Sequence, residues 1–116
     1  MEEIKPYRVE KPWGDYETFT QNRESTVKIL TINPHEAFSL QTHSKREEYW
    51  RVIQGSGIAT IGEDKKDIKL GDEIVIPIGT KHRLEAGEDT LKVLEISIGE
   101  FDEEDIIRLE DRYGRV

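Results

Sequence analysis

The sequence predicts an all-β domain built as an antiparallel sandwich or barrel. Between residues 26 and 99, short runs rich in valine, isoleucine and threonine alternate with turn residues, with a turn about every 8 to 12 residues. No part of this segment has the spacing of apolar residues that is typical of an amphipathic helix. Many short strands with no helix between them are typical of a sandwich or a barrel.

The first 25 residues differ from the rest, because Pro6, Pro12, Trp13 and Gly14 interrupt any regular pattern. We expect this extended N-terminal segment to pack an aromatic side chain across the barrel. The barrel itself spans residues 26–99, and Pro77 closes one of its strands, where the missing N–H costs least. The best strands are residues 27–32, 49–53, 58–61, 73–76 and 91–98.

The C-terminal segment, residues 100–116, has a different pattern. Asp102 can cap a helix whose first turn is acidic, and three apolar residues between positions 106 and 109 give that helix a narrow apolar stripe. We therefore expect a short helix from Asp102 to about Tyr113. The three segments together make one domain over residues 1–116, a length that fits a single core.

Composition narrows the possible functions. The 116 residues include 25 acidic and 17 basic side chains, for a net charge of -8, and no cysteine. Without cysteine the chain has no disulfide, thiolate zinc site or cysteine nucleophile, and the acidic balance argues against a nucleic-acid partner. No apolar run is long enough to span a membrane and the N-terminus lacks the pattern of a signal peptide, so we expect a cytoplasmic protein without a membrane partner.

The chain has only three histidines, so few metal-binding arrangements are available. Gln41 and His43 are two residues apart on an expected strand, so their side chains project from the same face. Glu48 follows a polar turn and would begin the partner strand, and His82 follows a turn that can aim its imidazole into the mouth of the barrel. Two imidazoles, a carboxylate and an amide oxygen can form a divalent-cation site. The alternative is that each histidine has only a structural role.

Basic residues adjoin both candidate histidine ligands. Lys45 and Arg46 directly follow the first histidine, and Lys81 and Arg83 flank the second. In an acidic chain this local positive charge favours phosphate binding, and arginine can bind phosphate through paired hydrogen bonds. We favour Arg46 for this role and keep Arg83 as a second substrate-binding candidate. The alternative for Lys81 and Arg83 is that both point outward into solvent.

Aromatic residues supply one further candidate for the pocket. Trp50 lies two residues after Glu48 and shares its face, so we expect it to line the pocket floor and contact the substrate. Trp13 and Phe38 can also stack on a sugar, but aromatic residues in small barrels more often belong to the core. His35 follows an Asn-Pro pair and is expected in a turn outside the metal site.

Two segments resemble the two motifs of the cupin superfamily. The first keeps His43, Glu48 and Gly55, but has Gln41 where many cupins have histidine and His35 where the motif begins with glycine. The second keeps the family's spacing of glycine, proline, glycine and histidine at Gly71, Pro77, Gly79 and His82. This resemblance implies a single cupin domain, which is a double-stranded β-helix or jelly-roll barrel.

The resemblance narrows to the type II mannose-6-phosphate isomerases and covers about residues 8–115. The matching segments are residues 11–17, 40–43, 76–80, 82–85, 105–108 and 110–115, together with Arg46, Glu48 and Trp50. In that family the domain usually forms the C-terminal part of a bifunctional enzyme with a mannose-1-phosphate guanylyltransferase domain. A chain of 116 residues cannot hold both, so we expect a stand-alone isomerase.

The resemblance also implies roles for single residues. Gln41, His43, Glu48 and His82 would bind one divalent metal ion, and Arg46 would be important for activity. The implied reaction interconverts mannose 6-phosphate and fructose 6-phosphate through an ene-diol. Nitrogen and oxygen ligands of this kind accept zinc, cobalt, manganese, nickel or iron. By analogy with small cupins, we expect a homodimer formed through sheet faces and N-terminal strands.

The general base stays open, because the sequence does not fix its distance from the carbon-bound proton. Lys45, a hydroxide on the metal, Glu36 and Glu85 are all candidates. Three positions depart from the family pattern: Lys45 and Tyr49 stand where histidine is common, and Ala86 stands where the cupin motif ends in asparagine. We interpret these departures as changes in the outer part of the pocket.

Two other classes of function remain open. A non-catalytic cupin that keeps the metal and sugar-phosphate pocket would act as a sensor or as a subunit of a separate guanylyltransferase. A non-haem iron oxygenase would also use two histidines and one carboxylate. The neutral Gln41 and the surrounding cations favour isomerisation over oxygen chemistry, whereas the departures from the family pattern favour the binding module.

Overall fold

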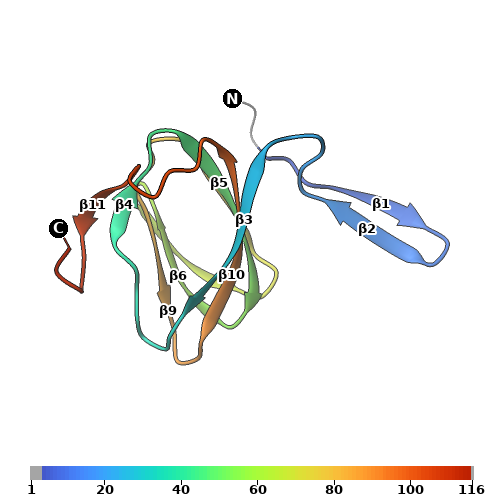
Figure 1. The fold of residues 1–116 in the computed structure, drawn as a ribbon. Coiled ribbons are helices and arrows are strands. Elements are labelled where there is room, and N and C mark those ends of the chain that lie inside the picture. Colours follow the sequence, from blue (N-terminus) through green and yellow to red (C-terminus); the bar gives the residue numbers. More distant parts are fainter. Residues whose placement is uncertain (1–3, 116) are drawn as a thin grey trace.

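The computed structural model describes residues 4–115, which contain eleven strands and no helix (Figure 1). The all-β prediction is therefore confirmed, and each of the five best predicted strands lies within an observed strand. No helix in the described part of the chain is long and apolar enough to cross a membrane. The strands are β1 (Tyr7–Lys11), β2 (Gly14–Thr18), β3 (Ser25–Ile32), β4 (Leu40–Thr42), β5 (Arg46–Gln54), β6 (Ser56–Ile61), β7 (Asp64–Lys69), β8 (Glu73–Ile76), β9 (His82–Ala86), β10 (Leu91–Gly99) and β11 (Ile107–Glu110).

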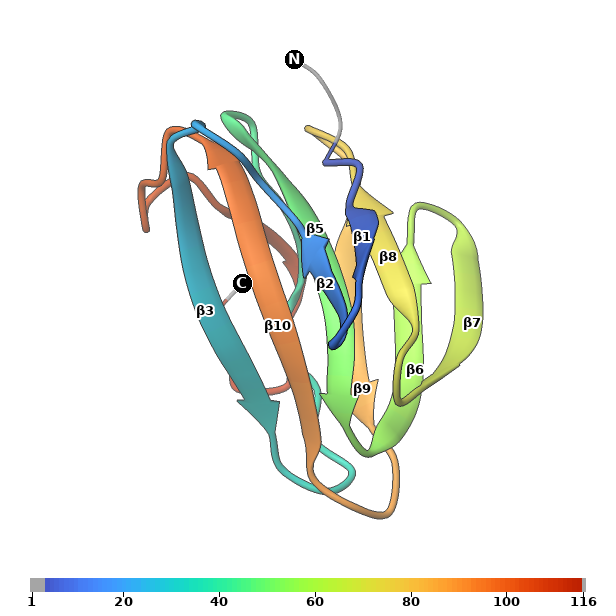
Figure 2. The same cartoon turned by 90° about the vertical axis from the view of Figure 1, so that its right-hand side faces the viewer.

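Two antiparallel sheets face each other and form the barrel (Figure 2). One sheet has the order β3-β10-β5-β8 and the other the order β11-β4-β9-β6-β7. Strands that are distant in the sequence are therefore neighbours, since β3 pairs with β10 and β4 pairs with β9. This order brings the end of β4 and the beginnings of β5 and β9 to the same end of the barrel.

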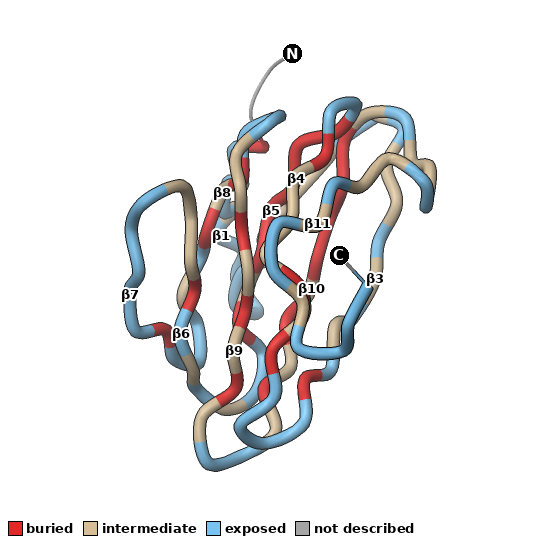
Figure 3. The backbone as a smooth tube through the Cα atoms, turned by 90° about the vertical axis from the view of Figure 1, so that its left-hand side faces the viewer, coloured by how far each residue is buried: buried red, intermediate tan, exposed pale blue. Residues whose placement is uncertain are grey.

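The main apolar core fills the space between the sheets, where many of the buried positions of Figure 3 lie. Alternate residues of each strand point inward, and Trp50, Val52, Leu84 and Val93 belong to one buried cluster drawn from β5, β9 and β10. Full burial of such a side chain contributes about 1.5 to 3 kcal/mol. The alternation of apolar and polar residues in the sequence thus corresponds to side chains that point in turn to the core and to the surface.

The N-terminal segment is a hairpin that projects from the outer face of the β3-β10-β5-β8 sheet (Figure 1). Trp13 lies at its turn and is 73% exposed, so it does not pack across the barrel as expected. Phe19 makes the aromatic contact instead, with its ring centroid 5.5 Å from that of Tyr49. Ile4 is buried in the same outer cluster. The N-terminal segment therefore covers part of the outside of the sheet.

The expected C-terminal helix is wrong, because the segment forms turns and then strand β11 along the edge strand β4. Ile107 is 64% exposed and Leu109 is 47% exposed, so the apolar stripe does not face the core. The segment leaves β10 at Gly99, where an added Cβ would lie 2.3 Å from the carbonyl oxygen of Lys45. Pairing with β11 gives the backbone N–H and C=O groups of the edge strand β4 hydrogen-bond partners. Packing only three apolar residues of a short helix against the barrel would stabilise the segment less.

Candidate metal centre

Two histidines lie together at the polar end of the barrel, with ring centroids 5.0 Å apart. His82 begins β9, and its Nδ1 lies 2.9 Å from the carbonyl oxygen of Thr80. His43 follows β4, and its Nδ1 lies 2.6 Å from the carbonyl oxygen of Asp105. Because a carbonyl oxygen can only accept, each Nδ1 donates a proton and each neutral ring keeps a lone pair on Nε2. This is the tautomer that a metal-binding histidine needs.

Glu48 of β5 completes a cluster with these histidines. The candidate ligand atoms of His43, Glu48 and His82 all lie within 4.8 Å of one another. Glu48 Oε1 is 3.2 Å from His82 Nε2, and both atoms are buried without a hydrogen-bond partner in the described part of the chain. Two acceptors held this close are unfavourable unless a cation lies between them. The cluster therefore fits a divalent metal ion and can bind one.

The protonation states at the cluster suit metal binding. Burial lowers the pKa of His43 below its ordinary value, although hydrogen bonding to Asp105 and the charge of Glu48 oppose the shift. For Glu48, burial opposes ionisation, but its polar neighbours His82, Glu95 and His43 hold its pKa below the ordinary value. A neutral imidazole and an ionised carboxylate are the ligand forms that bind metal.

Gln41 lies beside the cluster, opposite His82 in the pairing of β4 with β9. Its amide Nε2 is 3.3 Å from His43 Nε2, while its Oε1 accepts a hydrogen bond of 2.6 Å from Ser39. The amide nitrogen thus faces the site, and the expected role as an oxygen ligand requires the amide to rotate by half a turn. Exchange of the two ends needs no movement of the backbone.

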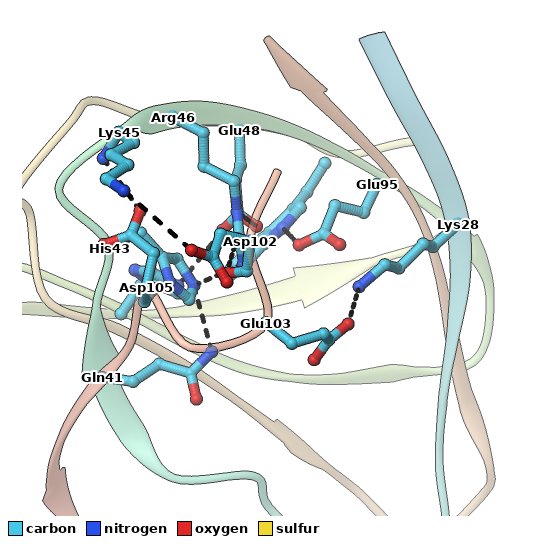
Figure 4. Close-up of polar contacts among 12 residues, drawn as sticks. Lys28, Gln41, His43, Lys45, Arg46, Glu48, Glu95, Asp102, Glu103 and Asp105 are labelled. Carbon is cyan, nitrogen blue, oxygen red and sulfur yellow. Dashed lines mark hydrogen bonds and ion pairs between the residues drawn. The ribbon is translucent and has the colours of Figure 1, made fainter. Parts of the chain in front are cut away.

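Arg46 forms one wall of the site (Figure 4), and its side chain is only 7% exposed. Its Nη2 donates to His43 Nε2 at 3.1 Å, and its Nε is 3.6 Å from Glu48 Oε2. The guanidinium also stacks on the ring of Phe101, with its carbon 4.4 Å from the ring centroid. Stacking fixes this cation at the candidate ligands, where it can bind an anionic group.

Glu95 is a functional candidate that the sequence analysis missed. It lies on β10, faces the barrel interior, and accepts a hydrogen bond of 3.3 Å from the indole N–H of Trp50. Burial and the neighbouring carboxylate of Glu48 raise the pKa of Glu95 to about 8. The signal was present in the sequence, because an acidic residue occupies an inward position of the apolar strand that begins at Leu91.

Asp105 is a second residue that was missed, because the acidic run around it was assigned to a helix. Its carboxylate accepts hydrogen bonds from the backbone N–H and hydroxyl of Ser44 and from the backbone N–H of Lys45. Partial desolvation opposes ionisation, but these donors hold the pKa of Asp105 below its ordinary value. Its carbonyl oxygen also accepts from His43. The C-terminal segment therefore orients a candidate metal ligand.

The other predicted site residues lie around the cluster rather than in it. Lys45 is 47% exposed, with its Nζ 3.7 Å from Glu100 and 4.0 Å from Asp102. Trp50 is buried behind the site, with its ring and that of His82 in a T-shaped contact, so it supports the site and does not line the cavity. Arg83 donates to the carbonyl oxygen of Phe38 and to Glu110. These contacts hold Arg83 outside the cavity.

Two departures from the family pattern are also outside the pocket, which corrects our interpretation of them. Tyr49 points to the outer face of the sheet, where its hydroxyl accepts a hydrogen bond from Arg51. Ala86 is buried in the apolar core. Among the three, only Lys45 stands near the site. His35 occupies a turn with a φ of 61°, as expected, and lies away from the cluster.

A cavity of about 240 Å³ opens beside the cluster. A larger cavity of about 670 Å³ adjoins it, and Leu30, Phe38 and Arg115 line both. Acidic and basic groups therefore meet in a space that suits a small polar ligand. The polar residues lining the smaller cavity are Gln41, His43, Glu48, Arg46, Glu95, Glu103, Lys28, Arg108 and Arg115.

The fold and the cluster define the class of protein, because solved structures with the same fold include cupins. A cupin protein from Bacteroides fragilis matches with a TM-score of 0.60 and 22% identity, over 70% of this chain and 74% of its own. Oxalate decarboxylase from Bacillus subtilis matches with a TM-score of 0.68 and 24% identity, over 75% of this chain and 24% of its own. The chain therefore has the cupin fold.

The particular family follows from the sequence match. Residues 2–111 match the family described as mannose-6-phosphate isomerase C-terminal, and the chain belongs to that family. The mannose-1-phosphate guanylyltransferase ManC of Salmonella typhimurium is 38% identical over 110 residues, covering 93% of this chain and 23% of the relative. The chain thus spans about a quarter of the length of such curated relatives.

Proposed function

We propose that the protein is a metal-dependent aldose-ketose isomerase that interconverts mannose 6-phosphate and fructose 6-phosphate. The observation that carries this proposal is the buried cluster of His43, Glu48 and His82 next to a cavity lined by cations. Membership of the mannose-6-phosphate isomerase C-terminal family supports it. Mannose 6-phosphate, one of the two sugar phosphates of this reaction, is an isomer of mannose 1-phosphate, the sugar phosphate in the name of the ManC relative.

The metal site would be formed by His43, Glu48 and His82, with Gln41 as a fourth ligand after rotation of its amide. A divalent ion bound there acts as a Lewis acid on a sugar oxygen. We propose one ion per chain, drawn from zinc, cobalt, manganese, nickel or iron, because each accepts nitrogen and oxygen ligands. The three ligands that face one another carry a single formal negative charge, so a bound divalent ion keeps its electron-withdrawing character.

The sequence favours Arg46 for binding the phosphate, but because it lies against His43 and Glu48 we propose instead that it stabilises the negative charge on the ene-diol oxygen. Its guanidinium contacts two candidate ligands and is held in place by Phe101, so little reorganisation is needed when charge appears. Glu95 lines the cavity next to Glu48, and we propose that its carboxyl moves the proton between C1 and C2. Its position in the cavity distinguishes it from the side chains considered earlier, Lys45, Glu36 and Glu85, none of which lines that cavity.

The earlier candidates for the base have less support. Lys45 is paired with Glu100 and Asp102 and does not line the cavity. Glu36 is hydrogen-bonded to Tyr113, and Glu85 is paired with Arg112. A catalytic role for Lys45 stays a prediction, and an unchanged pH profile of Lys45→Ala would exclude it as the base.

A coupled assay tests the proposed function. Purified protein is treated with a chelator, supplied with one divalent metal at a time, and given mannose 6-phosphate. Production of fructose 6-phosphate that depends on added metal is the expected result. Folded protein that binds metal but gives no turnover with any of the five ions would contradict the isomerase assignment.

A binding module is the second candidate, favoured by one observation. The curated relatives are guanylyltransferases about four times as long as this chain. A separate domain of this kind can therefore be a non-catalytic subunit of a guanylyltransferase on another polypeptide. In that case mannose 6-phosphate would bind and not be converted. Calorimetry beside the coupled assay separates the two functions.

We also propose a homodimer. Tyr7 and Trp13 on the projecting hairpin are 48% and 73% exposed, and Val27 and Ile29 on the outer face of β3 are each 59% exposed. An isolated hairpin has little stability of its own, and a second copy would cover these apolar groups. Light scattering that gives a monomer mass at micromolar concentration would contradict the dimer. The cytoplasmic location and the lack of nucleic-acid and membrane partners stay predictions.

A further inference from the structure

Arg108 lines the cavity and has no role in the reaction proposed above. It lies on β11, opposite Gln41 in the pairing of β11 with β4, and lines the same cavity as His43 and Glu48. Its Nε is buried and has no hydrogen-bond partner within residues 4–115. The same residues offer its guanidinium no carboxylate within ion-pair distance. Arg108 therefore presents unused donors to the cavity.

This lack of a partner is unusual for the chain. Acidic side chains outnumber basic ones by 25 to 17, so carboxylates are abundant. The other arginines of the C-terminal segment, Arg112 and Arg115, are paired with Glu85 and Asp111. Elsewhere Arg8, Arg51 and Arg83 are also paired with carboxylates. Burying part of an unpaired cation costs free energy, and an anionic ligand would offset that cost.

The charges around Arg108 also favour an anion. Lys28 and Arg46 line the same cavity, and both cations lie over the ring of Phe101, at 4.0 Å and 4.4 Å from its centroid. The carboxylate of Glu103 is 3.5 Å from Lys28, but this acid is 81% exposed and can move into solvent. The other two carboxyl groups that line the cavity have partners of their own, since Glu48 lies at His82 and Glu95 accepts from the indole N–H of Trp50 (Figure 4).

We propose that Arg108 binds the phosphate group of the sugar phosphate, with Lys28 adding positive charge. This inference rests on the proposed function, since it assigns one end of the same substrate. The reacting carbons then lie towards His43 and Glu48, and the phosphate lies towards β11. A guanidinium suits this role because its planar donors match two phosphate oxygens, and it stays charged at any working pH.

Direct binding measurements test the proposal. Chelated protein is titrated with inorganic phosphate, and metal-loaded protein with mannose 6-phosphate and with mannose, by calorimetry. We expect Arg108→Gln to weaken binding of both phosphate compounds by about 10- to 100-fold, the effect of losing charged hydrogen bonds. Mannose binding should not change, and Arg108→Lys should recover part of the loss. Arg112→Gln is the matched control, because it removes one positive charge from the same segment outside the cavity.

The outcomes separate this inference from the proposed function. Arg108→Gln that binds phosphate and mannose 6-phosphate as the unsubstituted protein does would overturn it, whether or not the protein is an isomerase. Phosphate binding that depends on Arg108 in a protein without turnover would support it and contradict the isomerase. If the variants do not fold, the Nε–H signal of Arg108 in the unsubstituted protein should shift as phosphate is added, and an unmoved signal would overturn the proposal.

Discussion

The two ends of the barrel interior are built from the same strands and differ in almost everything else. Along β9 the inward residues pass from His82 to Leu84, and along β5 they pass from Glu48 to Val52. The pairing of β10 with β5 places Ser97 opposite Glu48 at the polar end. At the other end Val93 lies opposite Val52, in the apolar cluster.

The apolar end of the barrel stabilises the fold, and the polar end holds the candidate metal ligands. The apolar end excludes water through packing alone, whereas the polar end depends on hydrogen bonds from loops and from the C-terminal segment. Trp50 lies between them, with its ring against His82 and its N–H bonded to Glu95. Substitutions at the two ends should therefore affect different measurements.

Removing a candidate ligand should have the largest effect. His82→Ala deletes a lone pair aimed at Glu48 and should abolish stoichiometric metal binding, with kcat/KM falling by more than about a thousandfold. Metal content by mass spectrometry and the coupled assay measure this. His35→Ala is the matched control, since that histidine lies in a turn away from the cluster. Metal retained at one ion per chain in His82→Ala would contradict the ligand assignment.

Leu84→Ala should act on stability and leave the chemistry in place. Leu84 is fully buried in the apolar cluster, so the substitution leaves a cavity and should cost about 3 kcal/mol of unfolding free energy. Denaturant unfolding measures the loss. Metal stoichiometry at low temperature should be unchanged, and a parallel loss of metal would show that the two ends are not independent.

Arg46→Ala should lower turnover while the metal stays bound. The guanidinium contacts His43 and Glu48 without being a ligand, so its loss should reduce kcat/KM by about a hundredfold, as for removal of one charge-stabilising donor. Kinetics and metal analysis of the same sample check this. An undiminished kcat/KM would remove Arg46 from the proposed mechanism.

Asp105→Ala should have the smallest effect, because it acts through a positioning contact. Without its carboxylate, Ser44 and Lys45 lose their acceptor, and the carbonyl that orients His43 is less firmly held. Metal affinity should fall by about tenfold, as for other contacts that orient a ligand. Asp105→Asn should restore part of it. Asp111→Ala removes the ion pair with Arg115 and no contact of His43, Ser44 or Lys45, so it should not change the affinity.

The sequence could reveal five of the eleven strands in the described part of the chain and three members of the cluster, but not the residues supplied by distant segments. His43, Glu48 and His82 each lie at a strand end, where alternation and turn chemistry predict an inward direction. The same alternation places Tyr49 on the outer face of the sheet, because it is adjacent to the inward Glu48. The family pattern led us to assign Tyr49 to the pocket instead. Strand β7 was missed because it is an edge strand in which only Ile68 is buried.

By itself, then, the sequence determined the class of fold, the core faces of the main strands and the residue types available for chemistry. Those properties depend on neighbours within a few positions, which a period of two records directly. Only the tertiary structure decided that the C-terminal segment pairs with β4, and so brought Asp105 and Arg108 to the site. Contacts between segments more than 60 residues apart leave no local pattern, because the chain must fold before those residues meet.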